Sequence, residues 1–288
     1  MELKKAERKQ AKMKLALQGP SGSGKTYSAL LMAFGLCGLW EKIVVIDTEN
    51  GSSNLYAHLG DFNVISISAP YSPEKFTSAI NLAEASEMTV VIVDSISHEW
   101  EGQGGILDVH GSMTGNSFTN WSKLTPRHNG FVQCMLNTNC HVIGTIRTKQ
   151  DYVLTEKNGK HVPEKVGLKG VTRDGMDYEF TAVLDLDLKH NATASKARTG
   201  LFMDKPQFMI TDSTGRKLRA WCEKGNNITD VIQQVQRAKT INKLRELYNE
   251  YPEHQKELES LFIGQKEILQ AETYTNDLTL KTSENGTT

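Results

Sequence analysis

The sequence predicts an α/β fold, in which a mostly parallel, twisted sheet is flanked by helices and carries a small C-terminal helical appendage. Strand-like and helix-like segments alternate from residue 13 to about residue 222, which is the rhythm of βαβ units with right-handed crossovers. Several of the strand-like segments are unbroken runs of Val and Ile, as expected for parallel strands covered on both faces. Helical spacing of apolar residues takes over after Trp221.

The elements follow from the same patterns. Residues 13–19 predict the first strand, and Lys25 to Leu39 predict the helix that follows it. A second helix is expected from Ser72, because Pro73 occupies its first position and Glu74 its first turn. Further strands are expected at 42–49, 62–68, 89–95, 141–147 and 180–188.

Four parts of the chain are expected from composition. These are a basic lead-in (1–12), the α/β core (13–222), a helical region (225–272) and a disordered polar tail (273–288). The helical region is expected to break near 249–252 and again at Gly264.

Whole-chain properties bound the function. The net charge is −1, so any affinity for nucleic acid must come from local basic patches. No window approaches 18 apolar residues, and the N-terminus lacks a secretion signal, so no membrane association is expected. The four cysteines are scattered, which favours a reducing compartment and a cytoplasmic location.

One motif carries specific chemistry. Gly19-Pro20-Ser21-Gly22-Ser23-Gly24-Lys25-Thr26 fits GxxxxGK[ST], the phosphate-binding loop, between a predicted strand and a predicted helix. Its backbone N–H groups and the helix N-terminus are expected to cradle phosphate oxygens, with Tyr27 directly behind them. Lys25 is expected to reach the β and γ phosphates of ATP, and Thr26 to bind Mg²⁺ through its hydroxyl.

A second half-site is expected at Asp94. It follows the apolar run Val90–Val93, so it should lie at the carboxyl end of a strand, where such sheets bind ligands. From there it would hold Mg²⁺ through water.

The order of elements resembles the RecA family, and the loop itself is similar to the RecA version. The resemblance implies that Glu49, at the end of the second strand, activates the attacking water, and that Tyr56 stacks on adenine. Ser95 follows Asp94, so no glutamate is available directly after the aspartate. Glu99 is the reserve candidate for the base.

Two further roles come from the same resemblance. A sensor of the γ-phosphate is expected at the end of the fifth strand, where Thr145, Arg147 and Lys149 are the alternatives. Lys196 and Arg198 match a Lys-x-Arg pair that reaches the nucleotide of a neighbouring subunit in a ring or filament. A basic β-turn explains the same pair almost equally well.

The stretches VIVDSISHEW, TNWSKLTPRHNGFV and KARTG make residues 13–222 similar to phage and mobile-element ATP-binding proteins, including Sak-type single-strand annealing ATPases. This resemblance implies binding of single-stranded DNA through the loops 98–120 and 149–173, with Trp100 and Phe118 as stacking groups. A charged surface hairpin is the alternative for the second loop. For a phage-encoded chain the location would be the cytoplasm of the bacterial host.

Three functions compete at this point. The first is an oligomeric, ATP-hydrolysing protein that acts on single-stranded DNA in recombination or replication, with a single-strand-binding protein as a further expected partner. The second is a nucleotide-switched partner-binding or loader protein that works through the C-terminal helices. The third, a small-molecule kinase, is disfavoured because no Arg-rich lid is apparent between the strands.

Overall fold

The computed structural model describes residues 11–157, 160–223, 228–251 and 254–284. The chain divides into two compact units. One spans Lys12–Cys222, and the described residues from Glu223 onward belong to the other. The expected lead-in 1–12 lies almost wholly outside the described residues.

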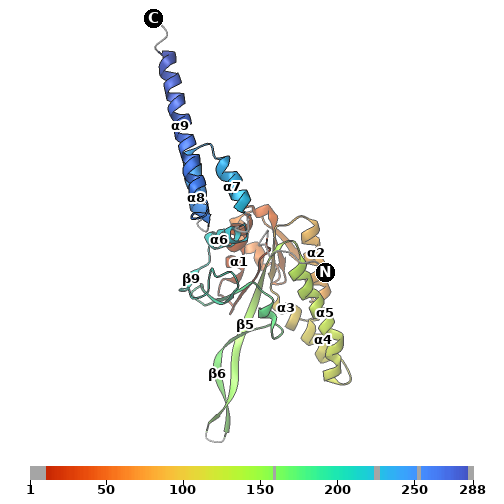
Figure 1. Ribbon diagram of the computed structural model, residues 1–288. Coiled ribbons are helices and arrows are strands. Elements are labelled where there is room, and N and C mark those ends of the chain that lie inside the picture. Colours follow the sequence, from red (N-terminus) through yellow and green to blue (C-terminus); the bar gives the residue numbers. More distant parts are fainter. Residues whose placement is uncertain (1–10, 158–159, 224–227, 252–253, 285–288) are drawn as a thin grey trace, which may run out of the picture. The chain divides into compact units, whose positions relative to one another are not determined.

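The larger unit is built on one mixed, mostly parallel sheet (Figure 1). Its described strands run in the order β3-β2-β4-β5-β1-β7-β8-β9, and β6 pairs with β5. The strands from β3 to β7 along this order are parallel, whereas β8 is antiparallel to both of its neighbours, β7 and β9. In chain order they are β1 (Lys14–Gly19), β2 (Ile43–Asp47), β3 (Asn63–Ser66), β4 (Val90–Asp94), β5 (His141–Lys157), β6 (Lys160–Gly170), β7 (Ala182–Leu186), β8 (Asn191–Ala197) and β9 (Phe208–Met209). The predicted α/β fold is confirmed.

Helices cover both faces of this sheet. The described helices of this unit are α1 (Lys25–Cys37), α2 (Pro73–Ala85), α3 (Ser97–Glu101), α4 (Ile106–Ser112), α5 (Ser117–Asn137) and α6 (Asp212–Glu223), with the short 3-10 helices η1 (Trp40–Lys42), η2 (Ser52–Leu59) and η3 (Met176–Tyr178). Alternate residues of β2 and β4 enter two separate apolar clusters. One cluster is shared with α1 and α6 and the other with α2 and α5. This double burial explains why these strands are unbroken Val and Ile runs.

Helices α1 and α6 approach each other at two glycines. A Cβ atom added to Gly35 would lie 2.0 Å from the carbonyl oxygen of Asp212, and one added to Gly215 would lie 2.1 Å from that of Met32. Because backbone rather than a flexible side chain occupies this space, only glycine allows the close packing.

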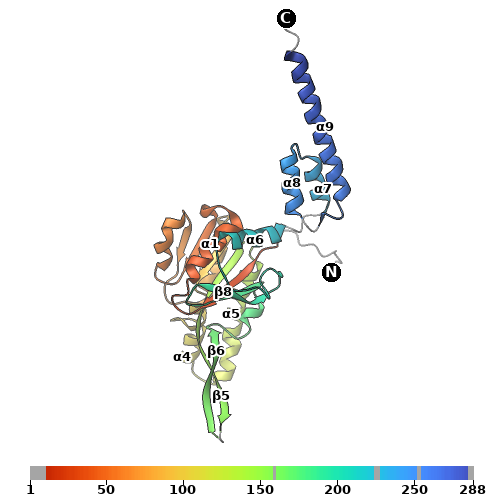
Figure 2. The ribbon, with the colours of Figure 1, turned by 90° about the vertical axis from the view of Figure 1, so that its left-hand side faces the viewer.

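Two segments expected to be DNA-binding loops contain regular secondary structure. The segment 98–120 is largely helical, since it contains most of α3, all of α4 and the start of α5. The segment 149–173 is mainly a two-stranded antiparallel ribbon of β5 and β6 (Figure 2), which corresponds to the hairpin alternative. Side chains 150–167 lie outside the described set.

The C-terminal unit contains α7 (Ile228–Gln236), α8 (Ile241–Glu250) and α9 (Glu259–Glu284). Its own apolar cluster includes Val231, Leu247 and Phe262. The break expected near 249–252 is present, because α8 ends at Glu250. The break expected at Gly264 is wrong, since α9 continues through it: a cost of about 1 kcal/mol for one helical glycine does not end a helix that has apolar contacts on both sides of it. Helix α9 also extends into the segment expected to be a disordered tail, of which 285–288 lie outside the described residues.

The glycine contact gives a stability prediction. Gly215→Ala should lower the free energy of unfolding by about 1–3 kcal/mol, because the added methyl group must displace the backbone of α1. Gly130→Ala in α5 is the matched control, since nothing lies within 4 Å of its added Cβ, and it should be neutral or slightly stabilising. Urea unfolding measures both variants, and equal stability of the two would contradict the close packing.

Candidate functional site

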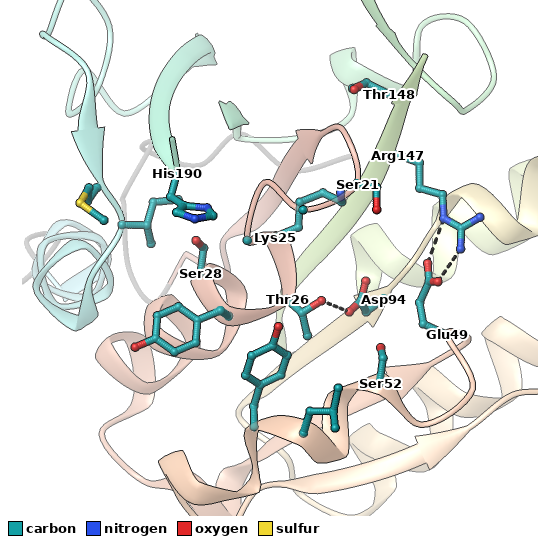
Figure 3. A pocket seen from close by; sticks show the side chains of 17 residues that line it. Ser21, Lys25, Thr26, Ser28, Glu49, Ser52, Asp94, Arg147, Thr148 and His190 are labelled. Carbon is teal, nitrogen blue, oxygen red and sulfur yellow. Dashed lines mark hydrogen bonds and ion pairs between the residues drawn. The ribbon is translucent and has the colours of Figure 1, made fainter. Parts of the chain in front are cut away.

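A large cavity lies at the carboxyl ends of β1, β2 and β4 and beside Arg147 of β5 (Figure 3). Its volume is about 900 Å³. Parallel sheets of this kind bind ligands at this edge. It is lined by Ser21, Gly22, Gly24, Lys25, Thr26, Tyr27, Ser28, Glu49, Ser52, Leu55, Tyr56, Asp94, Arg147, Thr148, His190, Met209 and Ile210. Most of the nucleotide-site residues expected from the sequence are therefore brought together.

The phosphate-binding loop joins β1 to α1. Gly22 and Gly24 have φ angles of 81° and 82°, a left-handed conformation that glycine adopts at little cost. The Lys25 ammonium donates hydrogen bonds of 2.9 Å to the carbonyl oxygens of Gly19 and Pro20, which fold the lysine back over the loop. Ser23 is buried, and its Oγ has no hydrogen-bond partner among the described residues.

The Lys25 ammonium interacts electrostatically with three other charged groups of the cavity. Burial lowers the pKa of its ammonium, while the nearby Asp94 and Glu49 carboxylates oppose that shift and Arg147 adds to it. The protonation of Lys25 therefore depends on the charges of Asp94, Glu49 and Arg147.

Asp94 is the most buried acidic group of the cavity wall, with 3% of its surface exposed. Its carboxylate accepts a hydrogen bond of 2.6 Å from the Thr26 hydroxyl and another from Thr145. Burial raises the pKa of Asp94, and the two threonine hydrogen bonds act in the opposite direction. Thr145, expected as an alternative sensor, therefore acts here as a partner of Asp94.

These groups fit a magnesium ion. Hydroxyl and carboxylate oxygens are the ligands that Mg²⁺ prefers, and Thr26 and Asp94 present them side by side. A divalent cation would also offset the cost of the buried negative charge on Asp94.

Glu49 and Arg147 form an ion pair in the same cavity. Arg147 Nε donates to Glu49 Oε1 at 3.0 Å, and Nη2 donates to Oε2. The loop that carries Glu49 is held by Asp47, whose carboxylate accepts from the backbone N–H groups of Glu49 and Ser53 at 2.7 and 2.9 Å. The positioning role of Asp47 was missed from the sequence, although an Asp that ends a strand before Asn-Gly is a turn signal.

The outer part of the cavity is aromatic and apolar. The Tyr27 and Tyr56 rings lie 5.9 Å apart, a suitable surface for a planar base. The other side is formed by His190, Met209 and Ile210, which sequence reasoning missed. No local motif could have revealed them, because they come from the region of β8 and β9, far along the chain.

Other expected residues lie elsewhere. Glu99 is fully buried, and both of its oxygens lie 3.0 Å from His128 Nδ1, so it is outside the described cavity lining. Lys196 and Arg198 also lie outside that lining. Both donate to the carbonyl oxygen of Tyr178 at 2.7 Å, which gives them a contact within their own chain that the sequence did not suggest.

A second cavity, of about 520 Å³, is lined by residues from both segments expected to bind DNA. We call it the tryptophan groove, and it is lined by Trp100, Trp121, Lys149, Lys169, Gly170, Val171, Thr172, Arg173 and Asp174. The two tryptophan rings lie 5.9 Å apart with an interplanar angle of 21°. Phe118, expected as a stacking group, is 86% exposed and outside the described lining.

Comparison with known proteins agrees with this site. Residues 11–216 match a family model described as an AAA domain. Because the match covers more than half of the chain, the protein belongs to this AAA-domain family of nucleotide-binding P-loop proteins. No curated protein matches the chain. In the part of the chain that the structure describes, no helix combines the length and the apolar character needed to cross a membrane.

Proposed function

We propose that this protein hydrolyses ATP with Mg²⁺ and couples the reaction to single-stranded DNA, as an oligomer, in phage or mobile-element recombination or replication. Strand annealing or pairing would be its task. The observation that carries the proposal is the meeting of Lys25, Thr26, Asp94 and Glu49 in one cavity. The RecA-like and Sak-type character rests on the sequence resemblance alone.

Each of these side chains has a role in hydrolysis. Lys25 would leave the loop carbonyls and bind the β and γ phosphates. Thr26 and Asp94 would hold Mg²⁺, which neutralises charge on the phosphates when bound. Glu49 would accept the proton of the attacking water, and Tyr27 and Tyr56 would hold the base.

Binding of single-stranded DNA is supported by the tryptophan groove. Indole rings offer a stacking surface for any base, and cationic side chains attract the phosphate backbone. Lys149 and Arg173 supply such charges at the same groove, and Lys169 adds a third that is paired with Asp174 at 2.7 Å. The groove shares strand β5 with the nucleotide site, since Thr148 lines one cavity and Lys149 the other.

Oligomer formation is supported by Lys196 and Arg198. Both side chains gather at the η3 turn, outside the described lining of their own nucleotide cavity. To reach the γ-phosphate of a neighbouring subunit, as the resemblance implies, they would exchange the carbonyl oxygens of Asp177 and Tyr178 for phosphate oxygens. There the two cations would stabilise transition-state charge.

The DNA proposal is tested by two substitutions in the groove. Arg173→Gln should weaken single-stranded DNA binding at all sequences and reduce the salt slope by about 0.7. Trp121→Leu should cost about 1–3 kcal/mol of binding through lost stacking. Both should reduce stimulation of ATP hydrolysis by DNA.

Lys42→Gln is the control, because Lys42 directly precedes β2 and so lies at the amino ends of the parallel strands, away from their carboxyl ends. Affinity is measured by fluorescence anisotropy and turnover by phosphate release. If DNA neither binds nor stimulates the wild-type protein, the DNA-coupled function is wrong, and the nucleotide-switched partner or loader protein becomes the better account.

The shared-site proposal is tested by complementation. Arg198→Ala should bind ATP normally, because the resident loop holds the phosphates, but hydrolyse it on the order of 10³-fold more slowly. Mixing it with Lys25→Ala subunits should restore part of the rate, since each variant supplies what the other lacks. Absence of rescue, with turnover independent of protein concentration, would exclude an active site shared between subunits.

A further inference from the structure

The Glu49–Arg147 ion pair spans a third strand. Glu49 follows β2 and Arg147 belongs to β5, and β4 lies between these two strands in the sheet. The pair therefore passes across the end of β4, where Asp94 is found. Both oxygens of the Glu49 carboxylate accept from the guanidinium, so the orientation of the proposed base is set by Arg147.

We propose that Arg147 is a positioning residue that holds Glu49 in an inactive orientation, and that the γ-phosphate of ATP releases Glu49 by taking over the guanidinium. This inference rests on the proposed function, because it concerns the same base and the same substrate. A nucleoside diphosphate lacks the phosphate group that competes with Glu49, so it would leave the pair intact.

The pair is suited to exchange of partners. The side chains of Arg147 and Glu49 are 41% and 26% exposed, and ion pairs at such exposure contribute little net stability. Guanidinium groups bind phosphate and carboxylate through the same two-pronged geometry. Arg147 and Lys25 line the same cavity. A γ-phosphate held by Lys25 would therefore compete with Glu49 for the Arg147 guanidinium.

Only the side chain of Arg147 needs to move. Its backbone N–H donates to the buried Ser97 hydroxyl at 2.9 Å, and its carbonyl oxygen accepts from Val171 N–H at 2.7 Å. The loop of Glu49 is fixed independently through Asp47. Both backbones are thus fixed, and only the ion pair between the two side chains can change partners. We call this exchangeable ion pair the latch.

A double-mutant cycle on nucleotide affinity tests the latch. The quantity measured is the affinity for a non-hydrolysable ATP analogue (AMP-PNP) divided by the affinity for ADP, by calorimetry. Glu49→Gln should raise this ratio by about fivefold, because the competitor for Arg147 is removed. In the Arg147→Gln background the same substitution should change the ratio by less than about twofold. Arg147→Met, which also removes the cation, replaces Arg147→Gln if the latter does not bind ADP.

The control is an equivalent pair outside the described cavity lining. Arg127 Nε and Nη2 donate to the two Glu74 oxygens at 2.7 and 2.8 Å, and Glu74→Gln should leave the ratio unchanged in either background. An equal rise in both Arg147 backgrounds would mean that Glu49 merely repels phosphate and would overturn the latch, as would no rise in either.

Turnover is measured in parallel so that the two claims can be separated. Full turnover in Glu49→Gln would remove Glu49 as the base and sink that part of the proposed function. The affinity cycle would still decide whether Arg147 exchanges Glu49 for the γ-phosphate.

Discussion

The arrangement of the nucleotide site depends on the buried carboxylate of Asp94. Thr26, at the start of α1, and Thr145, on β5, both donate to it. The carboxylate therefore ties the phosphate-binding loop to two strands of the sheet, one of which, β5, lies beside β1. A buried charge is costly unless it is hydrogen-bonded or near a cation, and that cost is what makes Asp94 suited to binding a metal ion.

Around Asp94, the loops at the carboxyl edge of the sheet are held by a few polar contacts. Asp47 fixes the turn that carries Glu49, and Arg147 fixes the direction of the Glu49 carboxylate. The same strand, β5, then contributes Lys149 to the tryptophan groove. The nucleotide cavity and the tryptophan groove thus share one strand, because Thr148 lines the first and Lys149 the second.

Much of the core and the phosphate-binding loop could be predicted from the sequence, because both are local patterns. The Val and Ile runs mark the central strands, and the glycines, Lys25 and Thr26 mark the loop. The sequence did not predict the Arg147–Glu49 pair or the His190 wall, because both depend on strand order, which no local pattern specifies. Likewise, Trp121 and Arg173 line one groove because the tertiary structure places α5 beside the segment that follows the β5–β6 ribbon, and no local pattern specifies that arrangement.

The most direct test of the account is the Mg²⁺ dependence of nucleotide affinity, measured by titration of AMP-PNP with and without Mg²⁺. In the wild-type protein Mg²⁺ should tighten binding, because Asp94 and Thr26 would hold the cation beside the phosphates. Asp94→Asn should bind the Mg²⁺-free analogue at least as well but lose about tenfold or more of the tightening. An Asp94→Asn protein with the wild-type Mg²⁺ dependence would contradict the central role given to this carboxylate.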